Sequence, residues 1–187
     1  MPSPEQLHAL AAVAPCCVAC EQEFDIPAGV TAAQWATETG WGRSMPDGSN
    51  NPFGIKSYPG CAGEVLAQTR EWFTPVQLHQ FLRLGKGRTA RPDPGEATKP
   101  DGHACYIVQD LFACFPTLEE AFRHRAQLLT TSPLYRGAVT AYRVNRDPSQ
   151  FIDAIAQHYA TDPGYAHLLK TLAFGPAITQ AVVHAQA

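Results

Sequence analysis

The feature that most restricts the fold is a single pair of strand-like segments set between helical ones. Residues Val65–Phe73 and Cys105–Phe115 are rich in aromatic and β-branched residues, which favour strands. The segments before and after them carry apolar residues at helical spacing. One hairpin among several helices predicts a mainly helical α+β fold. Because 187 residues suffice for one compact domain but not comfortably for two, we expect a single domain over residues 1–187.

Capping signals predict where the helices begin. Ser3 as N-cap, followed by Pro4 and Gln6, predicts a helix that Pro15 kinks or restarts before it ends near Phe24. A second helix is expected over residues 28–39, with Gly40 as its stop. Further helices are expected after the Thr117-Leu118-Glu119-Glu120 capping box, over about 149–160, from about 162, and after Gly175-Pro176.

An unusually long excursion, about residues 75–102, separates the two predicted strands. Its second part is expected to be a loop, because glycine and proline recur there at positions 85, 87, 92, 94, 95, 100 and 102. Long loops in compact domains tend to be functional or mobile. The alternative is a solvated insertion with no role.

Charge and hydropathy exclude two classes of partner. The formal net charge is −3, which argues against nucleic-acid binding through bulk electrostatics. No apolar run approaches the roughly 20 residues of a membrane span, so no membrane insertion is expected. The first basic residue is Arg43, so the N-terminal segment lacks the positive charge of a signal peptide. We therefore expect export by a specialised secretion system or release by phage.

The cysteine count is high, and the histidines show no ligand pattern. The C-x-x-C from Cys17 to Cys20 has no second cysteine pair or histidine pair near it, which argues against zinc. His79 and His103 lie in the excursion without ligand spacing, so we expect no metal and no cofactor. A mixture of disulfides and small buried thiols is expected for Cys16, Cys17, Cys20, Cys61, Cys105 and Cys114.

Glu38 is the carboxyl whose surroundings best suit acid catalysis. It falls in the last turn of the second helix, where the negative end of the helix dipole disfavours an ionised carboxylate. Trp35 lies three residues earlier on the same face, and Trp41 follows. An apolar neighbour and a negative dipole both raise a glutamate pKa, as a general acid near neutral pH requires. The alternative is an ordinary surface glutamate at a helix end.

Three motifs in series resemble one enzyme family. They are Glu38-Thr39-Gly40-Trp41-Gly42, then Asn51-Pro52-Phe53-Gly54-Ile55-Lys56, and finally Tyr159-Ala160-Thr161-Asp162-Pro163-Gly164-Tyr165-Ala166. Together they resemble the glucosaminidase domain of glycoside hydrolase family 73, over about residues 5 to 173. The resemblance implies a lysozyme-like fold and an endo-β-N-acetylglucosaminidase that cuts the β-1,4 glycan strand of peptidoglycan after N-acetylglucosamine.

The resemblance also implies roles for particular residues. Glu38 falls on the catalytic acid, Tyr159 on an active-site tyrosine, and Glu71 fits the second carboxylate, with Glu64 and Asp110 in reserve. Substrate contacts are expected from Trp41, Asn51, Phe53, Tyr58 and Trp72, although core packing is the favoured role for Phe53. The chain departs from the family pattern at Thr39, Pro52 and Arg125, where serine, leucine and histidine are usual.

Several functions stay open at this point. A lytic transglycosylase also uses one glutamate, and a non-catalytic glycan-binding module is the alternative from another class. An action in the periplasm or on the cell wall fits either a phage endolysin or an antibacterial effector delivered into a rival cell. The second is favoured, because disulfides would form in an oxidising compartment. Such an effector would need an immunity protein as its partner.

Overall fold

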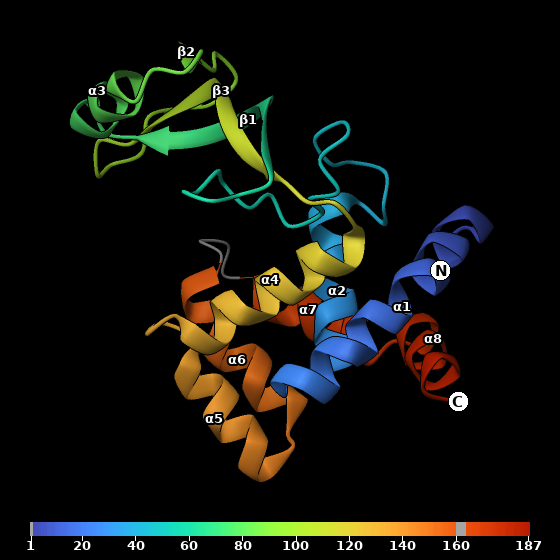
Figure 1. Cartoon of the computed structure of the whole chain (residues 1–187). Coiled ribbons are helices and arrows are strands. Elements are labelled where there is room, and N and C mark those ends of the chain that lie inside the picture. The colour runs from blue at the N-terminus through green and yellow to red at the C-terminus, as the bar shows by residue number, and fades with distance from the viewer. Residues whose placement is uncertain (1, 160–163) are drawn as a thin grey trace. The chain divides into compact units, whose positions relative to one another are not determined.

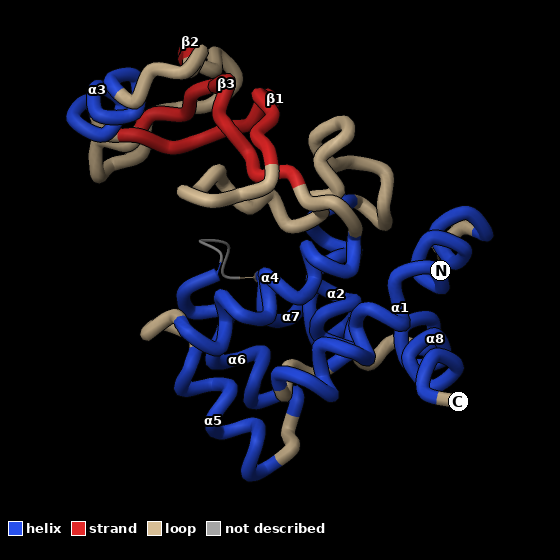
Figure 2. The backbone as a smooth tube through the Cα atoms, in the orientation of Figure 1, coloured by secondary structure: helices blue, strands red, loops and turns tan. Residues whose placement is uncertain are grey.

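The computed structural model describes residues 2–159 and 164–187 of the chain (Figure 1). The chain divides into two compact units, one made of Met1–Met45 with Thr117–Ala187 and the other of Pro46–Pro116. The first unit contains helices, and the described strands all belong to the second (Figure 2). The fold is therefore mainly helical with one small antiparallel sheet, as the sequence predicts.

Helices of the first unit pack around a common apolar core. Helix α1 contacts α2, α4 and α8, and α2 also contacts α7. Their fully buried side chains include Phe122, Phe151 and Leu10. The helices are α1 (Pro4–Phe24), α2 (Ala28–Thr39), α4 (Leu118–Thr131), α5 (Arg136–Asn145), α6 (Pro148–Tyr159), α7 (Tyr165–Ala173) and α8 (Pro176–Gln186).

The predicted helix starts are confirmed, with two differences. The Ser3 capping box forms, but α1 continues as one helix through Pro15. The buried residues on both sides of this proline, such as Val13 and Cys17, hold the helix against its neighbours. Helix α5 was not predicted, because it begins at Arg136 with no side-chain cap. The expected start near residue 162 lies outside the described residues.

The second unit is a three-stranded antiparallel sheet with one helix. It consists of β1 (Gly63–Phe73), α3 (Pro75–Arg83), β2 (Thr89–Pro92) and β3 (Ala104–Cys114), and the strand order is β1-β3-β2. The two predicted strands are confirmed as β1 and β3, whose register pairs Glu71 with Tyr106.

The expectation of a loop in the second part of the excursion is wrong at one point, because β2 pairs there with β3. This strand lies at the edge of the sheet, where Pro92 is tolerated since its missing N–H costs no ladder bond. The first part of the excursion forms α3. Its N-cap Thr74 makes a reciprocal capping box with Gln77, and Pro75 occupies the first turn.

The expectation of disulfides is also wrong, because all six cysteines are free thiols. Cys17 and Cys20 are fully buried on the packed face of α1. Cys20 lies with its sulfur 3.5 Å from the carbonyl oxygen of Phe122 on α4. These cysteines therefore act as small apolar side chains. Among the described residues, no helix is long and apolar enough to cross a membrane.

Phe122 provides a test of the helical core. We expect Phe122→Ala to lower the free energy of unfolding by about 3–5 kcal/mol, because it removes a fully buried ring and leaves a cavity. Leu128→Ala on the same helix is the control: Leu128 is 44% exposed, and its loss should cost less than about 0.5 kcal/mol. Urea unfolding measures both changes. Equal losses for the two variants would contradict this description of α4.

Candidate active site

Glu38 lies in the last turn of α2, a helix whose other residues are mostly buried. Its neighbours on the helix, Trp35 and Thr39, are buried, whereas Glu38 itself is exposed. The helix begins at Ala28 and ends at Thr39, as predicted, with Gly40 as its left-handed cap. The packing of α2 therefore fixes the backbone that carries this carboxyl while leaving the carboxyl accessible.

A tight turn follows Glu38 and depends on one buried hydroxyl. Thr39 Oγ1 donates to the carbonyl oxygen of Trp35 and accepts from the N–H of Gly42, both at 2.6 Å. Serine could supply the same hydroxyl, which explains why threonine is tolerated here. Gly42 has a φ of 84°, and an added Cβ would lie 3.0 Å from the Trp35 ring. The motif is thus a turn that needs its glycine.

The protein around Glu38 favours the protonated acid. Burial raises the pKa of the Glu38 carboxyl, and the Arg125 cation offsets part of this rise. The Glu38 side chain is exposed, so solvent and a ligand reach it even though the neighbouring protein displaces part of its water. This combination is what a general acid requires.

Arg125 is the residue of this site whose role the sequence did not reveal. It is only 2% exposed on α4, and its Nη1 donates to Thr31 Oγ1 on α2 at 3.3 Å. The sequence shows it only as a departure from an expected histidine. A stronger signal was available, because Arg125 occupies the apolar face of α4 between Phe122 and Leu129. A buried cation on such a face usually serves a charged partner.

Tyr159 belongs to the same electrostatic group. Burial raises the pKa of its phenol; the Arg125 cation lowers this pKa and the Glu38 carboxylate raises it. The ring stacks on Tyr165 with centroids 5.7 Å apart, and Gln34 donates to the Tyr165 hydroxyl at 3.1 Å. The structure therefore brings Glu38, Arg125 and Tyr159 together. The four residues after Tyr159 in the sequence motif lie outside the described residues.

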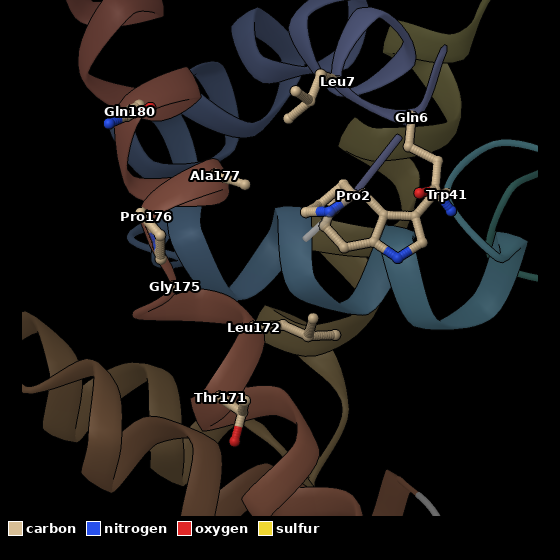
Figure 3. Close-up of a pocket in the computed structure, with 10 residues that line it drawn as sticks. All are labelled: Pro2, Gln6, Leu7, Trp41, Thr171, Leu172, Gly175, Pro176, Ala177 and Gln180. Carbon is tan, nitrogen blue, oxygen red and sulfur yellow. The ribbon is translucent and has the colours of Figure 1, made fainter. Parts of the chain in front are cut away.

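Trp41 faces a different part of the helical unit. It lines a pocket of about 660 Å³ together with residues of α1, α7 and α8 (Figure 3). Figure 3 shows its indole ring across the pocket from Pro176 and Ala177. Among the described residues, those lining this pocket do not include Glu38.

In the sheet unit, Asn51 and Phe53 are buried in the loop before β1. The Asn51 amide donates to the carbonyl oxygens of Ile55 and Ala113 at 2.8 and 2.9 Å and accepts from the Ile55 N–H. Both of its N–H donors are therefore used inside the protein. Phe53 is 9% exposed. These two residues shape the loop that carries Lys56.

Glu71 lies on β1, paired with a lysine. The ammonium of Lys56 is 2.7 Å from Glu71 Oε1. Trp72 follows directly and so points to the opposite face of the strand. The ammonium of Lys99 lies over the Trp72 ring, 4.2 Å from the ring centroid. The structure therefore does not place Trp72 beside Glu71.

The two reserve carboxylates have partners of their own. Glu64 accepts from the Ser57 hydroxyl and pairs with Lys86 at 3.3 Å. Asp110 lies 2.7 Å from Arg88 Nε and 2.8 Å from Lys56 Nζ. Tyr58 lines a separate pocket of about 510 Å³ with Glu64 and Lys86.

Comparison with known families decides which kind of protein this is. A profile described as mannosyl-glycoprotein endo-β-N-acetylglucosaminidase matches residues 14–173. The chain belongs to this glucosaminidase family. The resemblance seen in the sequence is thereby confirmed: the chain is a member of a glycoside hydrolase family and has a lysozyme-like fold.

Relatives of this glucosaminidase come from several bacteria. It is 28% identical over 156 residues to the peptidoglycan hydrolase FlgJ of Escherichia coli strain K12. The matched region covers 81% of this chain and 40% of FlgJ. The chain thus spans about two fifths of the length of the curated relatives it matches.

Solved structures show the same fold. The catalytic domain of the autolysin Auto from Listeria monocytogenes superposes with a TM-score of 0.68 at 21% identity, covering 97% of this chain and 89% of that one. A mutant peptidoglycan hydrolase from Sphingomonas sp. A1 gives 0.64 at 27% identity, covering 95% and 99%.

Metal ligands do not gather in the described part of this glucosaminidase. Within residues 2–159 and 164–187, no group of three or more histidine, cysteine, aspartate or glutamate side chains could hold a metal ion.

The raised pKa of Glu38 predicts a stability gain on its removal. A carboxyl whose pKa is higher in the folded state penalises folding once the pH rises above its ordinary value of about 4.3. We therefore expect Glu38→Gln to melt at a higher temperature than the native chain at pH 7, with the gain vanishing below about pH 4. Glu120→Gln, at an exposed position on α4, is the control. A lower melting temperature for Glu38→Gln at pH 7 would contradict the raised pKa.

Proposed function

We propose that this glucosaminidase hydrolyses the β-1,4 glycan strand of peptidoglycan after N-acetylglucosamine, with Glu38 as the general acid. The observation that carries the proposal is the Glu38 carboxyl at the end of α2. Solvent reaches this carboxyl, yet the surrounding protein displaces enough of its water to raise its pKa. The names of its relatives support the substrate, since they are described as peptidoglycan hydrolases. The family description supports the sugar.

The proposed reaction begins with a proton from Glu38. Cleavage of a glycosidic bond needs a proton on the leaving oxygen and stabilisation of an oxocarbenium-like centre. The protonated Glu38 supplies the first. Once it has given up its proton it becomes a carboxylate, and the Arg125 cation that opposes the rise of its pKa stabilises this form. Arg125 thereby keeps the acid from holding its proton too tightly.

Tyr159 is proposed to act beside Glu38. Its phenol interacts electrostatically with both Glu38 and Arg125, and its ring is fixed by the stack on Tyr165. A hydroxyl held in this way can hydrogen-bond the N-acetyl group of the substrate or the attacking water. In the first case the acetamide oxygen attacks the anomeric carbon, and no enzyme nucleophile is needed.

Glu71 is proposed as the second carboxylate. It is ion-paired with Lys56 on the sheet unit, and it would position the water as a base or stabilise positive charge on the sugar. Among the predicted substrate-binding residues, Tyr58 and Trp41 line pockets and are retained as sugar contacts. We propose that Asn51 and Phe53 hold the loop before β1 in place. For Trp72 we propose a sugar contact on the face of β1 opposite to Glu71.

The proposal for Glu38 is tested by Glu38→Gln. We expect this variant to lose at least about 100-fold in the rate of turbidity loss of purified peptidoglycan, because glutamine has no proton to give. Glu120→Gln is the matched control and should keep full activity. Full lysis by Glu38→Gln, with circular dichroism unchanged, would remove Glu38 from the mechanism.

The products distinguish hydrolysis from the lytic transglycosylase alternative. A hydrolase that cuts after N-acetylglucosamine leaves reducing N-acetylglucosamine ends, whereas a transglycosylase releases an anhydro-sugar. Mass spectrometry of the digest separates the two. Anhydro products would keep Glu38 in its role but replace the proposed reaction.

A wall-glycan substrate places the proposed action in the periplasm or on the cell wall. Harm to cells when the chain is directed to the periplasm, but not when it stays in the cytoplasm, tests this location. The choice of an effector over an endolysin rested on disulfides, and the six free thiols remove that support.

A further inference from the structure

Lys56 ends the second sequence motif and has no role in the mechanism above. Its ammonium touches two carboxylates, with Nζ 2.7 Å from Glu71 Oε1 and 2.8 Å from Asp110 Oδ2. Both partners belong to the sheet, on β1 and β3 respectively. One ammonium therefore joins the proposed second carboxylate to a third carboxyl group.

The sheet alone does not bring the two carboxyl groups together. Asp110 is paired with Ala67, and Glu71 lies four residues further along β1. An even separation puts Glu71 and Asp110 on the same face of the sheet. Four residues separate the backbone positions by about 13 Å along the strand, yet both carboxylate oxygens lie within 2.8 Å of one ammonium. The two side chains therefore converge, and their like charges need a cation as a bridge. Lys56 provides that bridge.

The lysine is itself fixed from two sides. Its backbone pairs with Phe112 in an isolated antiparallel bridge, and its ammonium lies 4.3 Å from the centroid of the Phe112 ring. On the far side of Asp110, Arg88 Nε lies 2.7 Å from Oδ1. Partial burial pushes the pKa of Asp110 up, but the hydrogen bonds from Lys56, Arg88 and the Leu111 N–H outweigh it and hold this pKa below its ordinary value. Asp110 is therefore an ionised anchor.

We propose that Lys56 is the positioning residue for Glu71, with Asp110 as the anchor that holds the ammonium in place. The inference rests on the proposed function, in which Glu71 is the second carboxylate. A lysine side chain has a flexible four-carbon stem, and a single surface ion pair does not fix it. Two carboxylates on one ammonium, together with an aromatic face, restrict it to one place. The geometry of Glu71 is thereby determined by the loop that Asn51 closes.

The first experiment separates positioning from binding. We expect Lys56→Met to lower kcat on soluble glycan fragments by about 10- to 100-fold with little change in KM, because a misplaced catalytic group loses rate at this scale. Lys56→Arg should recover most of the loss. Lys170→Met is the matched control, since Lys170 also pairs with a carboxylate, Asp153, at 2.7 Å, and neither residue has a role in the proposed reaction. The Lys56 side chain is 44% exposed, so the melting temperature should change little.

A double-mutant cycle tests whether Lys56 acts through Glu71. In a Glu71→Gln background, Lys56→Met should cause no further loss of kcat, whereas independent roles would give additive losses. Asp110→Asn, a variant of the anchor itself, should lower kcat in the same way but by a smaller factor than Lys56→Met. Additive losses, or full activity of Lys56→Met beside an impaired Glu71→Gln, would overturn the inference while leaving the proposed function intact.

The failure of the proposed function looks different. Full activity of Glu71→Gln would remove the second carboxylate and the role of Lys56 with it. Full activity of Glu38→Gln would remove the general acid and says nothing of the lysine. Measuring the three single variants side by side therefore assigns any failure to one of the two ideas.

Discussion

The hydroxyl of Thr39 is the interaction on which the acid site depends. It closes the turn that ends α2, bonding Trp35 on one side and Gly42 on the other at 2.6 Å. Without this closure the last turn of the helix would fray, as helix ends do when their polar groups lack partners. Glu38 is the residue just before it. A buried hydrogen bond and a glycine thus fix the backbone that carries the carboxyl.

Local signals explain which parts of the fold could be predicted. Helix α2, its glycine stop and the Glu38 motif depend on residues close in sequence, and the sequence predicts them correctly. Helix α3 carried the same kind of signal, because Thr74, Pro75 and Gln77 repeat the pattern seen at Ser3. The glycines and prolines that follow it hide this signal in the sequence. Strand β2 gave no such signal, since an edge strand is defined by the partner it finds.

Contacts between segments far apart in the chain could not be predicted from local sequence patterns. The pairing of Lys56 with Glu71 and Asp110 follows from the register of β1 on β3, which no single segment encodes. Arg125 could be seen as unusual in an apolar helix face, but its partners could not. The disulfide expectation failed for a related reason. A cysteine count says nothing about where the sulfurs lie, and on α1 Cys17 and Cys20 were used as small apolar residues.

The surroundings of the two proposed catalytic carboxyl groups differ in kind, and this difference supports the separate roles proposed for them. The helical unit displaces water from around the Glu38 carboxyl. This desolvation raises the pKa of Glu38 and keeps a proton available. Glu71 instead meets an ammonium at 2.7 Å that a second carboxylate holds in place. A carboxyl kept short of water can give a proton, whereas an ion-paired one suits orienting water or facing positive charge. In the proposed reaction, two glutamates thus serve opposite ends because one environment removes water and the other supplies a cation.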